Sequence, residues 1–370
     1  MVLPAATQAT PDVLQGLPDA PMPFSRDVTA AVDWPYGEHV VIEQPNDVDQ
    51  ALLQQAAKWA FEPAVAEQMT VSLLITRGDQ VLLERYAPGF DAATRTRTWS
   101  TAKSIASTLI GMLVEDGLLS LDDPLPVDWL PKLAVSETDP RANITLRHVL
   151  HMASGLYPVD SSRMEYQSGS GLAYWAGESS VIEARRRGLV RTPGTFWDYE
   201  NYDTLLAIYA MRRVLPDAQS YHGYPSQRLL KKLGMHHTLI GADRFGDFIL
   251  SSQVYSNARD LGRLGLLYLN EGVWRGERLI SKDWIDFIRT PAPITTNPRA
   301  QYGGQWWLVP NDRTDIPKDA YATAGSRGQF VIVVPSHQIV IVRRGLDYGL
   351  QGFNFWDLTR EVLKALPPTR

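Results

Sequence analysis

The chain has 370 residues, with 36 basic and 41 acidic side chains, a formal net charge of −5 at pH 7 and no cysteine. Hydrophobic residues make up 44% and charged residues 21% of the sequence, which excludes disordered, collagen-like and coiled-coil proteins. The acidic balance argues against binding to nucleic acid or to an anionic membrane, and the absence of thiols excludes disulfides, zinc–thiolate sites and iron–sulfur clusters.

The first 30 residues are expected to form an irregular leader. Residues 1–24 are rich in Ala, Pro and Thr and lack the basic and apolar segments of a signal peptide. No apolar run approaches the roughly 18 residues needed to span a bilayer. The compartment stays open: periplasmic or secreted if a signal peptide has been removed, and otherwise cytoplasmic.

Two β-hairpins are predicted, one towards each end of the chain. Residues 71–76 and 81–86 are β-prone runs separated by a turn that contains Gly78, and residues 329–334 and 339–343 repeat this pattern around the turn 335–338. Helical apolar spacing follows over residues 355–366 and ends at Pro367.

Between the hairpins, the sequence predicts helices. Apolar residues recur at three- and four-residue spacing over 104–119, 145–152, 202–215 and 226–233, with Gly and Pro between these stretches. We therefore expect an α+β fold, in which an antiparallel sheet flanked by helices is built from both ends of the chain. The expected boundaries are 31–115 and 255–370 for this discontinuous sheet domain and 116–254 for a mostly helical inserted domain.

Several common site motifs are absent from the sequence. No serine lies in a Gly-x-Ser-x-Gly motif, and there is neither a Gly-x-x-x-x-Gly-Lys loop nor a Gly-x-Gly-x-x-Gly loop after a strand. The pairs His148/His151 and His236/His237 lack the glutamate of a His-Glu-x-x-His site. We predict packed or capping histidines at these positions and no metal site.

Ser100 and Lys103 form the first candidate catalytic pair. A Ser and a Lys three residues apart at a helix start share one face, so the amine can reach the hydroxyl. Serine needs a base to become a nucleophile, and lysine can be that base when burial lowers its pKa. The alternative is that Ser100 is only a helix N-cap.

Two later segments supply further candidate groups. In Trp197-Asp-Tyr199-Glu-Asn201, the tyrosine and the asparagine project the same way from an extended loop, as a proton relay and a carbonyl-binding amide. In Thr323-Ala-Gly325-Ser326-Arg327, small residues at a strand start allow a substrate to lie close, with a backbone N–H free to bind an oxyanion. The alternatives are a packed tyrosine and an ordinary glycine-rich strand entry.

Together these motifs resemble those of the penicillin-recognising serine hydrolases, which include class C β-lactamases, DD-peptidases, family VIII esterases and 6-aminohexanoate-dimer hydrolases. The family pattern is Ser-x-x-Lys, Tyr-x-Asn and then Lys-Thr-Gly or a variant. The segments 116–124, 144–155, 256–260 and 302–307 are also similar to stretches of that family, so the resemblance spans roughly residues 70–345.

The resemblance implies a β-lactamase/penicillin-binding-protein-like fold with its active site between the domains. Ser100 would be the acylated nucleophile, Lys103 its general base and Tyr199 the proton relay. Backbone N–H groups of Ser100 and Ser326 would form the oxyanion hole, and Asn201 would orient Lys103 or the substrate carbonyl. Hydrolysis would pass through an acyl-enzyme without a metal or organic cofactor.

The third motif departs from the family pattern. Thr323-Ala-Gly325 lacks the lysine with which penicillin-binding members grip a carboxylate, and Arg327 either replaces it or is solvated. We therefore expect an esterase or amidase that acts on small-molecule linear esters or amides. The alternatives are a β-lactamase or D-amino-acid peptidase, and a catalytically silent penicillin-binding-like module. Aromatic residues either line a cleft for acyl chains or pack in the core, namely Tyr166, Tyr174, Trp175, Trp197 and Trp307.

Overall fold

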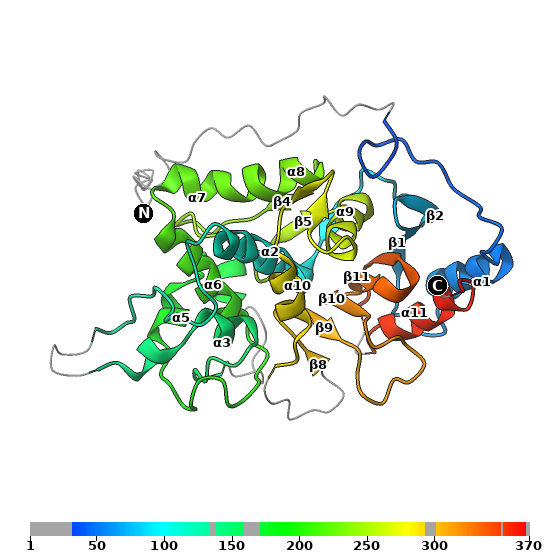
Figure 1. Ribbon diagram of the computed structural model, residues 1–370. Helices are drawn as coiled ribbons and strands as arrows, with labels where there is room; N and C mark the ends of the chain where they lie inside the picture. Colours follow the sequence, from blue (N-terminus) through cyan, green and yellow to red (C-terminus); the bar gives the residue numbers. More distant parts are fainter. Residues whose placement is uncertain are drawn as a thin grey trace, which may run out of the picture.

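The computed structural model describes residues 32–132, 138–158, 171–175, 177–292, 301–348 and 351–367, so the expected leader lies outside the described residues. Its centre is a seven-stranded sheet in the order β2-β1-β12-β11-β10-β9-β8, in which every pair of neighbours is antiparallel (Figure 1). The strands are β1 (Thr70–Arg77), β2 (Gln80–Tyr86), β8 (Gln301–Tyr302), β9 (Trp307–Leu308), β10 (Tyr321–Gly325), β11 (Gln329–Val334) and β12 (Ile339–Gly345).

Both predicted hairpins are confirmed, and they lie side by side in this sheet. β1 pairs with β2 through the turn at Gly78, and β11 pairs with β12 through the short helix η6 (Pro335–His337). β12 also pairs with β1, with Leu74 opposite Val342. The two ends of the chain therefore build one sheet, which confirms the predicted α+β fold.

The sheet is buried on both faces, as the alternation of its side chains shows. Ile332 and Ile341 face the helices α1 (Gln50–Phe61) and α11 (Phe355–Leu363), whereas their neighbours Val331 and Val342 belong to the core on the other face. Figure 1 shows α1 and α11 together on one side of the sheet. Side chains that alternate at a period of two, apolar on both faces, are typical of a central strand covered by two layers.

The segment between the hairpins is largely helical, and α2 packs against α6 and α3 against α6. Its helices are α2 (Ala102–Glu115), α3 (Leu146–Leu150), α4 (Gly171–Trp175), α5 (Ile182–Arg186), α6 (Asn201–Val214), α7 (Ala218–Pro225), the π-helical turn η5 (Ser226–Leu230) and α8 (Lys231–Leu233), with the short η3 (Pro140–Asn143). These helices share one continuous hydrophobic core with the sheet face opposite α1, so the predicted boundaries at 116 and 254 stay a prediction.

The predicted end of the helix that carries Lys103 is wrong. The helix expected over 104–119 ends at Glu115, because Gly117 has a positive φ of 70° that turns the chain out of the helix. The stretch expected over 226–233 is confirmed as η5 and α8. The helix α7 directly before it was not predicted, and its start is capped by the Asp217 side chain, which accepts a hydrogen bond from the Ser220 backbone N–H.

The remaining elements connect the helical segment to the sheet. They are the small sheet β3 (Thr96–Arg97), β5 (Val254–Ser256) and β4 (Leu239–Ile240), the helices α9 (Ala258–Leu269) and α10 (Lys282–Arg289), and the hairpin β6 (Val273–Trp274) and β7 (Glu277–Arg278). Of these, α9 packs directly on β11 and β12.

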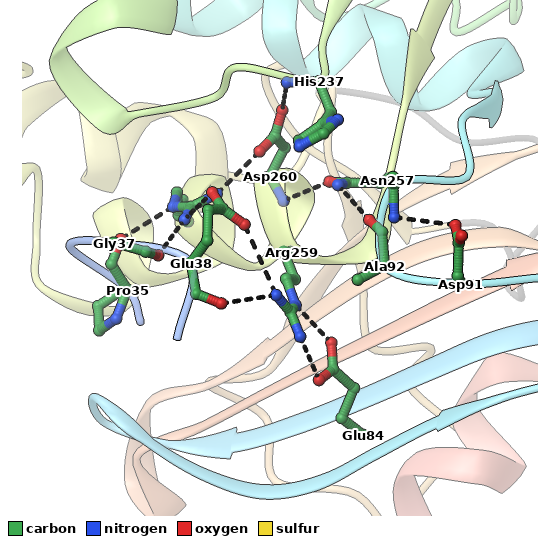
Figure 2. Close-up of polar contacts among 12 residues, drawn as sticks. Pro35, Gly37, Glu38, Glu84, Asp91, Ala92, His237, Asn257, Arg259 and Asp260 are labelled. Atoms are coloured by element: carbon green, nitrogen blue, oxygen red, sulfur yellow. Dashed lines mark hydrogen bonds and ion pairs between the residues drawn. The ribbon is translucent and has the colours of Figure 1, made fainter. Parts of the chain in front are cut away.

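A network of charged side chains fixes the start of α9 (Figure 2). Arg259 binds both carboxylate oxygens of Glu84 on β2, at 2.7 and 2.8 Å, and Arg263 pairs with Glu38 at 2.6 Å. Asp260 accepts a hydrogen bond from the His237 backbone and pairs with Arg263 at 2.8 Å. Residues 256–260, which the sequence singled out, therefore tie α9 to the sheet and to the segment that precedes α1.

The described part of the chain contains neither a membrane-spanning helix nor a cluster of metal-binding side chains. None of its helices is both long and apolar enough to cross a bilayer. Nor does it contain three or more His, Asp or Glu side chains grouped so that they could hold a metal ion.

Candidate active site

Ser100 lies on a bent turn between β3 and α2. It belongs to the short helix η2 (Trp99–Thr101), and Trp99 directly before it has a φ of +50°, in the left-handed region that a bulky residue rarely adopts. The Thr98 backbone N–H donates to Val254 O at 2.7 Å, and Thr101 Oγ1 donates to Gln329 O at 3.0 Å. The turn is thus held from both sides in a strained form, as is common at functional sites.

Lys103 lies in the first turn of α2 and is only 1% exposed. Its Nζ donates to Ser100 Oγ at 3.1 Å, to Asn201 Oδ1 at 2.6 Å and to the backbone carbonyl of Ser251 at 3.0 Å. None of these three acceptors carries a negative charge. The structure thereby brings Ser100, Lys103 and Asn201 together, although Lys103 and Asn201 are 98 positions apart in the sequence.

Tyr199 lies in the loop before α6 and completes this group. Burial raises the pKa of the Tyr199 phenol, while its hydrogen bond with Ser100 acts in the opposite direction. The Lys103 Nζ lies 4.9 Å from the centre of the Tyr199 ring. At neutral pH the phenol therefore keeps its proton and lies beside both the hydroxyl and the amine.

Gly325 brings the end of β10 against the serine turn. A Cβ atom at this position would lie 2.2 Å from the Thr98 carbonyl oxygen and 3.1 Å from the Ser100 nitrogen. Only glycine allows so close an approach of two backbones. Ser326 follows directly and is exposed, so the turn that it begins lies next to the Ser100 backbone.

Thr323 and Arg327 differ in where their side chains lie. Thr323 is buried, with its Oγ1 3.1 Å from Thr101 Oγ1 and accepting a hydrogen bond from the Val331 backbone. These contacts brace the serine turn against the sheet, and a substrate contact of Thr323 stays a prediction. Arg327 is exposed, has a φ of +60°, and its guanidinium lies 5.7 Å from the Trp99 ring.

Aromatic rings gather beside Tyr199. Trp307 lies 5.5 Å from Tyr199, 6.2 Å from Trp197 and 5.0 Å from Tyr302, measured between ring centres. The indole N–H of Trp197 is buried with no hydrogen-bond partner within the described ranges. Tyr174 contributes its hydroxyl 2.7 Å from Ser251 Oγ, while Trp175 is exposed and Tyr166 lies outside the described residues.

The histidines have structural contacts. His148 Nδ1 accepts a hydrogen bond from the Thr145 backbone at 3.1 Å, as part of the cap of α3. His151 is buried and stacks on Phe287 at 4.8 Å, and burial lowers its pKa to about 4, so it is neutral at physiological pH. These contacts agree with packed and capping histidines.

Three residues of this region carried no signal in the sequence. Ser251 acts through its backbone carbonyl, which every residue possesses, so no motif could identify it. Gln329 and Arg344 lie in the predicted terminal hairpin. The Gln329 backbone carbonyl accepts from Thr101 in the serine turn, and the Arg344 side chain reaches Thr96 in β3, only because the chain folds back through the sheet.

The sheet architecture and the serine–lysine pair at the start of α2 define the β-lactamase/penicillin-binding-protein-like class of folds. A family model described as Beta-lactamase matches residues 60–343, more than half of the chain, and the chain belongs to this family.

Several proteins similar to this chain are named as hydrolases. The 6-aminohexanoate-dimer hydrolase of Paenarthrobacter ureafaciens is 27% identical over 302 residues, which cover 76% of this chain and 74% of that protein. The fold is similar to a family VIII carboxylesterase, with a TM-score of 0.66, 14% identity and coverage of 88% and 98% of the two chains. It is also similar to a D-stereospecific amidohydrolase from Streptomyces sp., with a TM-score of 0.62, 19% identity and coverage of 86% and 98%.

Proposed function

We propose that this chain is a serine hydrolase that cleaves esters or linear amides through an acyl-enzyme on Ser100. The observation that carries the proposal is the 3.1 Å contact between Lys103 Nζ and Ser100 Oγ, made by a lysine that is only 1% exposed. Relatives named for a 6-aminohexanoate dimer, for carboxylic esters and for amides support ester or amide bonds as the target.

Acylation begins with the attack of Ser100 Oγ on the substrate carbonyl carbon. Lys103 Nζ, in its neutral form, takes the hydroxyl proton and becomes an ammonium group, and the oxygens of Asn201 and Ser251 that face it stabilise this charge. The backbone N–H groups of Ser100 and Ser326 bind the oxyanion that forms on the carbonyl oxygen.

Collapse of the tetrahedral intermediate expels the leaving group, which needs a proton. Tyr199 donates it and is reprotonated from the Lys103 ammonium, because burial keeps the phenol protonated and it lies beside both groups. Water then attacks the acyl-enzyme with the same residues acting as base and acid. The products are a carboxylic acid and the released alcohol or amine, with Ser100 regenerated.

The third motif favours esters and linear amides over β-lactams. The position of the family's lysine is held by Thr323, a buried neutral residue whose hydroxyl is engaged by Thr101 and Val331. The two alternatives to be tested are a β-lactamase or D-amino-acid peptidase and a catalytically silent penicillin-binding-like module.

The test is intact-mass spectrometry after brief exposure to a fluorophosphonate, an activated ester and a penicillin in separate samples. Wild-type protein is compared with Ser100→Ala and with Ser107→Ala, since Ser107 is a buried serine of the adjoining helix α2 whose hydroxyl donates to Gly304 O. We expect one fluorophosphonate adduct on the wild type and on Ser107→Ala, none on Ser100→Ala, and turnover of the ester.

Each other outcome points to a different reading. A stable or rapidly turned-over penicillin adduct on Ser100 would favour the β-lactamase or peptidase alternative. No adduct with any reagent would favour the silent module, and an adduct that survives in Ser100→Ala would disprove this assignment of the nucleophile.

A further inference from the structure

Arg344 is a buried arginine near the end of β12 that has no carboxylate partner among the described residues. It is 1% exposed, and burial lowers its pKa to about 9. Its Nε donates to Gln329 Oε1 at 2.8 Å and one Nη donates to the Ser256 carbonyl at 2.6 Å. The other Nη donates to the Thr96 hydroxyl at 2.6 Å and the Thr96 carbonyl at 2.8 Å.

The neighbouring arginine shows how such a charge is usually stabilised. Arg343 is also buried, but it pairs with the Asp347 carboxylate at 2.8 Å. A buried guanidinium that binds neutral oxygens alone has given up water without gaining an ion pair. What Arg344 gains instead is a fixed geometry, because its planar fork directs several N–H groups at fixed angles.

The acceptors of Arg344 lie directly beneath the serine turn. Thr96 is in β3, which leads within three residues into Trp99 and Ser100. Ser256 is in β5, and the β5 residue Val254 accepts the Thr98 N–H at 2.7 Å. Arg344 therefore binds both β3 and β5, the two strands that hold the turn of Ser100.

Gln329, which accepts a hydrogen bond from Arg344, also contacts the turn of Ser326. Its Nε2 donates to the Arg327 carbonyl at 2.8 Å, within the turn that begins at Ser326. Its own backbone carbonyl accepts from Thr101 Oγ1 at 3.0 Å, one residue after the nucleophile. The side-chain pair of Arg344 and Gln329 thus connects β3, which leads into the turn of Ser100, with the turn of Ser326.

We propose that Arg344 and Gln329 are positioning residues that set the spacing between the two backbone N–H donors of the oxyanion hole. The proposal rests on the proposed function, in which those donors belong to Ser100 and Ser326. An oxyanion hole works only when its donors lie about 2.7–3.1 Å from the developing charge, and a displacement of about 1 Å can cost about 100-fold in rate.

The test compares Arg344→Lys and Gln329→Met with wild type. Lysine keeps the positive charge but cannot span the acceptors of the guanidinium, and methionine removes the link without changing any charge. We expect both variants to lower kcat on an activated ester and the rate of fluorophosphonate labelling by about 10- to 100-fold, with KM within about twofold of wild type. Such a split indicates a loss confined to the transition state.

Arg141→Lys is the control, because Arg141 is a buried arginine of the helical segment that binds the backbone carbonyls of Leu130, Arg185 and Arg187, in addition to its ion pair with Asp139. We expect it to lower the melting temperature while leaving both rates unchanged. If Arg344→Lys does not fold, Gln329→Met decides. Wild-type rates in the folded variants would overturn the proposal, as would a rate loss that Arg141→Lys shares. Wild-type protein that is never labelled at Ser100 would instead refute the proposed function.

Discussion

The sheet face covered by α1 and α11 buries aliphatic side chains such as Ile75, Ile332 and Ile341, whereas the region around α2 buries Lys103 and Arg344. In the first region the positive φ of a non-glycine residue is confined to Gln338 in the exposed turn between β11 and β12, whereas in the second such residues, Trp99 and Arg327, lie on the turns of Ser100 and Ser326. The fold therefore gains stability from apolar burial on one face of the sheet, and it tolerates backbone strain and buried charge around Ser100, where the geometry serves the chemistry.

The region around Ser100 that buries Lys103 and Arg344 is called the polar region. Within it, Lys103→Ala should lower the rate of acylation more than any other single substitution. Removing the base leaves Ser100 Oγ without a proton acceptor, so acylation should fall by about 10⁴-fold or more. Rapid-mix mass spectrometry with an activated ester measures this rate, and circular dichroism checks the fold. Lys232→Ala removes an exposed lysine paired with Glu277 and should acylate normally. A normally acylating Lys103→Ala would refute the base assignment.

Tyr199→Phe should have the next largest effect. The ring would stay in its aromatic cluster, but no phenol would carry the proton to the leaving group, so turnover should fall by about 10²- to 10⁴-fold. Steady-state hydrolysis of an ester and an amide measures it, with the larger loss expected on the amide, whose leaving group needs the proton more. Tyr302→Phe, in the same cluster, should keep full activity. A full-rate Tyr199→Phe enzyme would leave Lys103 as the sole proton carrier.

The same comparison explains which parts of the molecule the sequence predicts. The hairpins are predictable from local apolar patterns. Successive strand residues such as Val331 and Ile332 point to opposite faces of the sheet, and both faces are buried, so an unbroken apolar run is enough to indicate the strand. Ser100 and Lys103 are predictable because three residues on a helix fix their separation, and the structure places them 3.1 Å apart.

Other contacts depend on tertiary folding and leave no local pattern. Arg344 and Thr96 are 248 residues apart in the sequence, and the Ser251 carbonyl that faces Lys103 is backbone. The end of α2 was not predicted, because Gly117 ends the helix through its positive φ and apolar spacing does not show this. Sequence patterns therefore report elements and local pairs, while the contacts that hold the polar region together appear only in the folded chain.

Ile332→Ala probes the sheet face covered by α1 and α11, which is called the apolar region, and should leave the catalytic rate unchanged. Ile332 is fully buried on the α11 side of β11, so truncation leaves a cavity and should lower the free energy of unfolding by about 2–5 kcal/mol. Urea denaturation measures that loss, and kcat at a temperature where the variant stays folded should match wild type. A parallel loss of kcat would show that the two regions are coupled rather than separate.

Asp203→Asn should have the smallest effect on stability, and this effect should depend on pH. Asp203 on α6 is buried, and its carboxylate accepts from the Ser154 hydroxyl at 2.7 Å and the Ser154 backbone N–H at 3.3 Å. Burial raises the pKa of this carboxyl from 3.8 to about 8, and the charges of Glu200 and Asp198 add to the increase. The folded state therefore holds a proton that the unfolded chain has already released.

Because the folded pKa is the higher one, the free energy of unfolding of the wild type should decrease as pH rises from about 4 to about 8 through this group. Asparagine keeps an oxygen for Ser154 and cannot ionise, so the melting temperature of Asp203→Asn relative to wild type should increase by a few degrees between pH 5 and pH 8. Asp315→Asn is the control: its pKa is lowered to about 2 by the hydrogen bond from Arg313, so its difference from wild type should stay constant over that range. A constant difference for Asp203→Asn as well would mean that this carboxyl is already ionised in the fold, and that the polar region tolerates buried negative charge as readily as it tolerates the positive charge of Arg344.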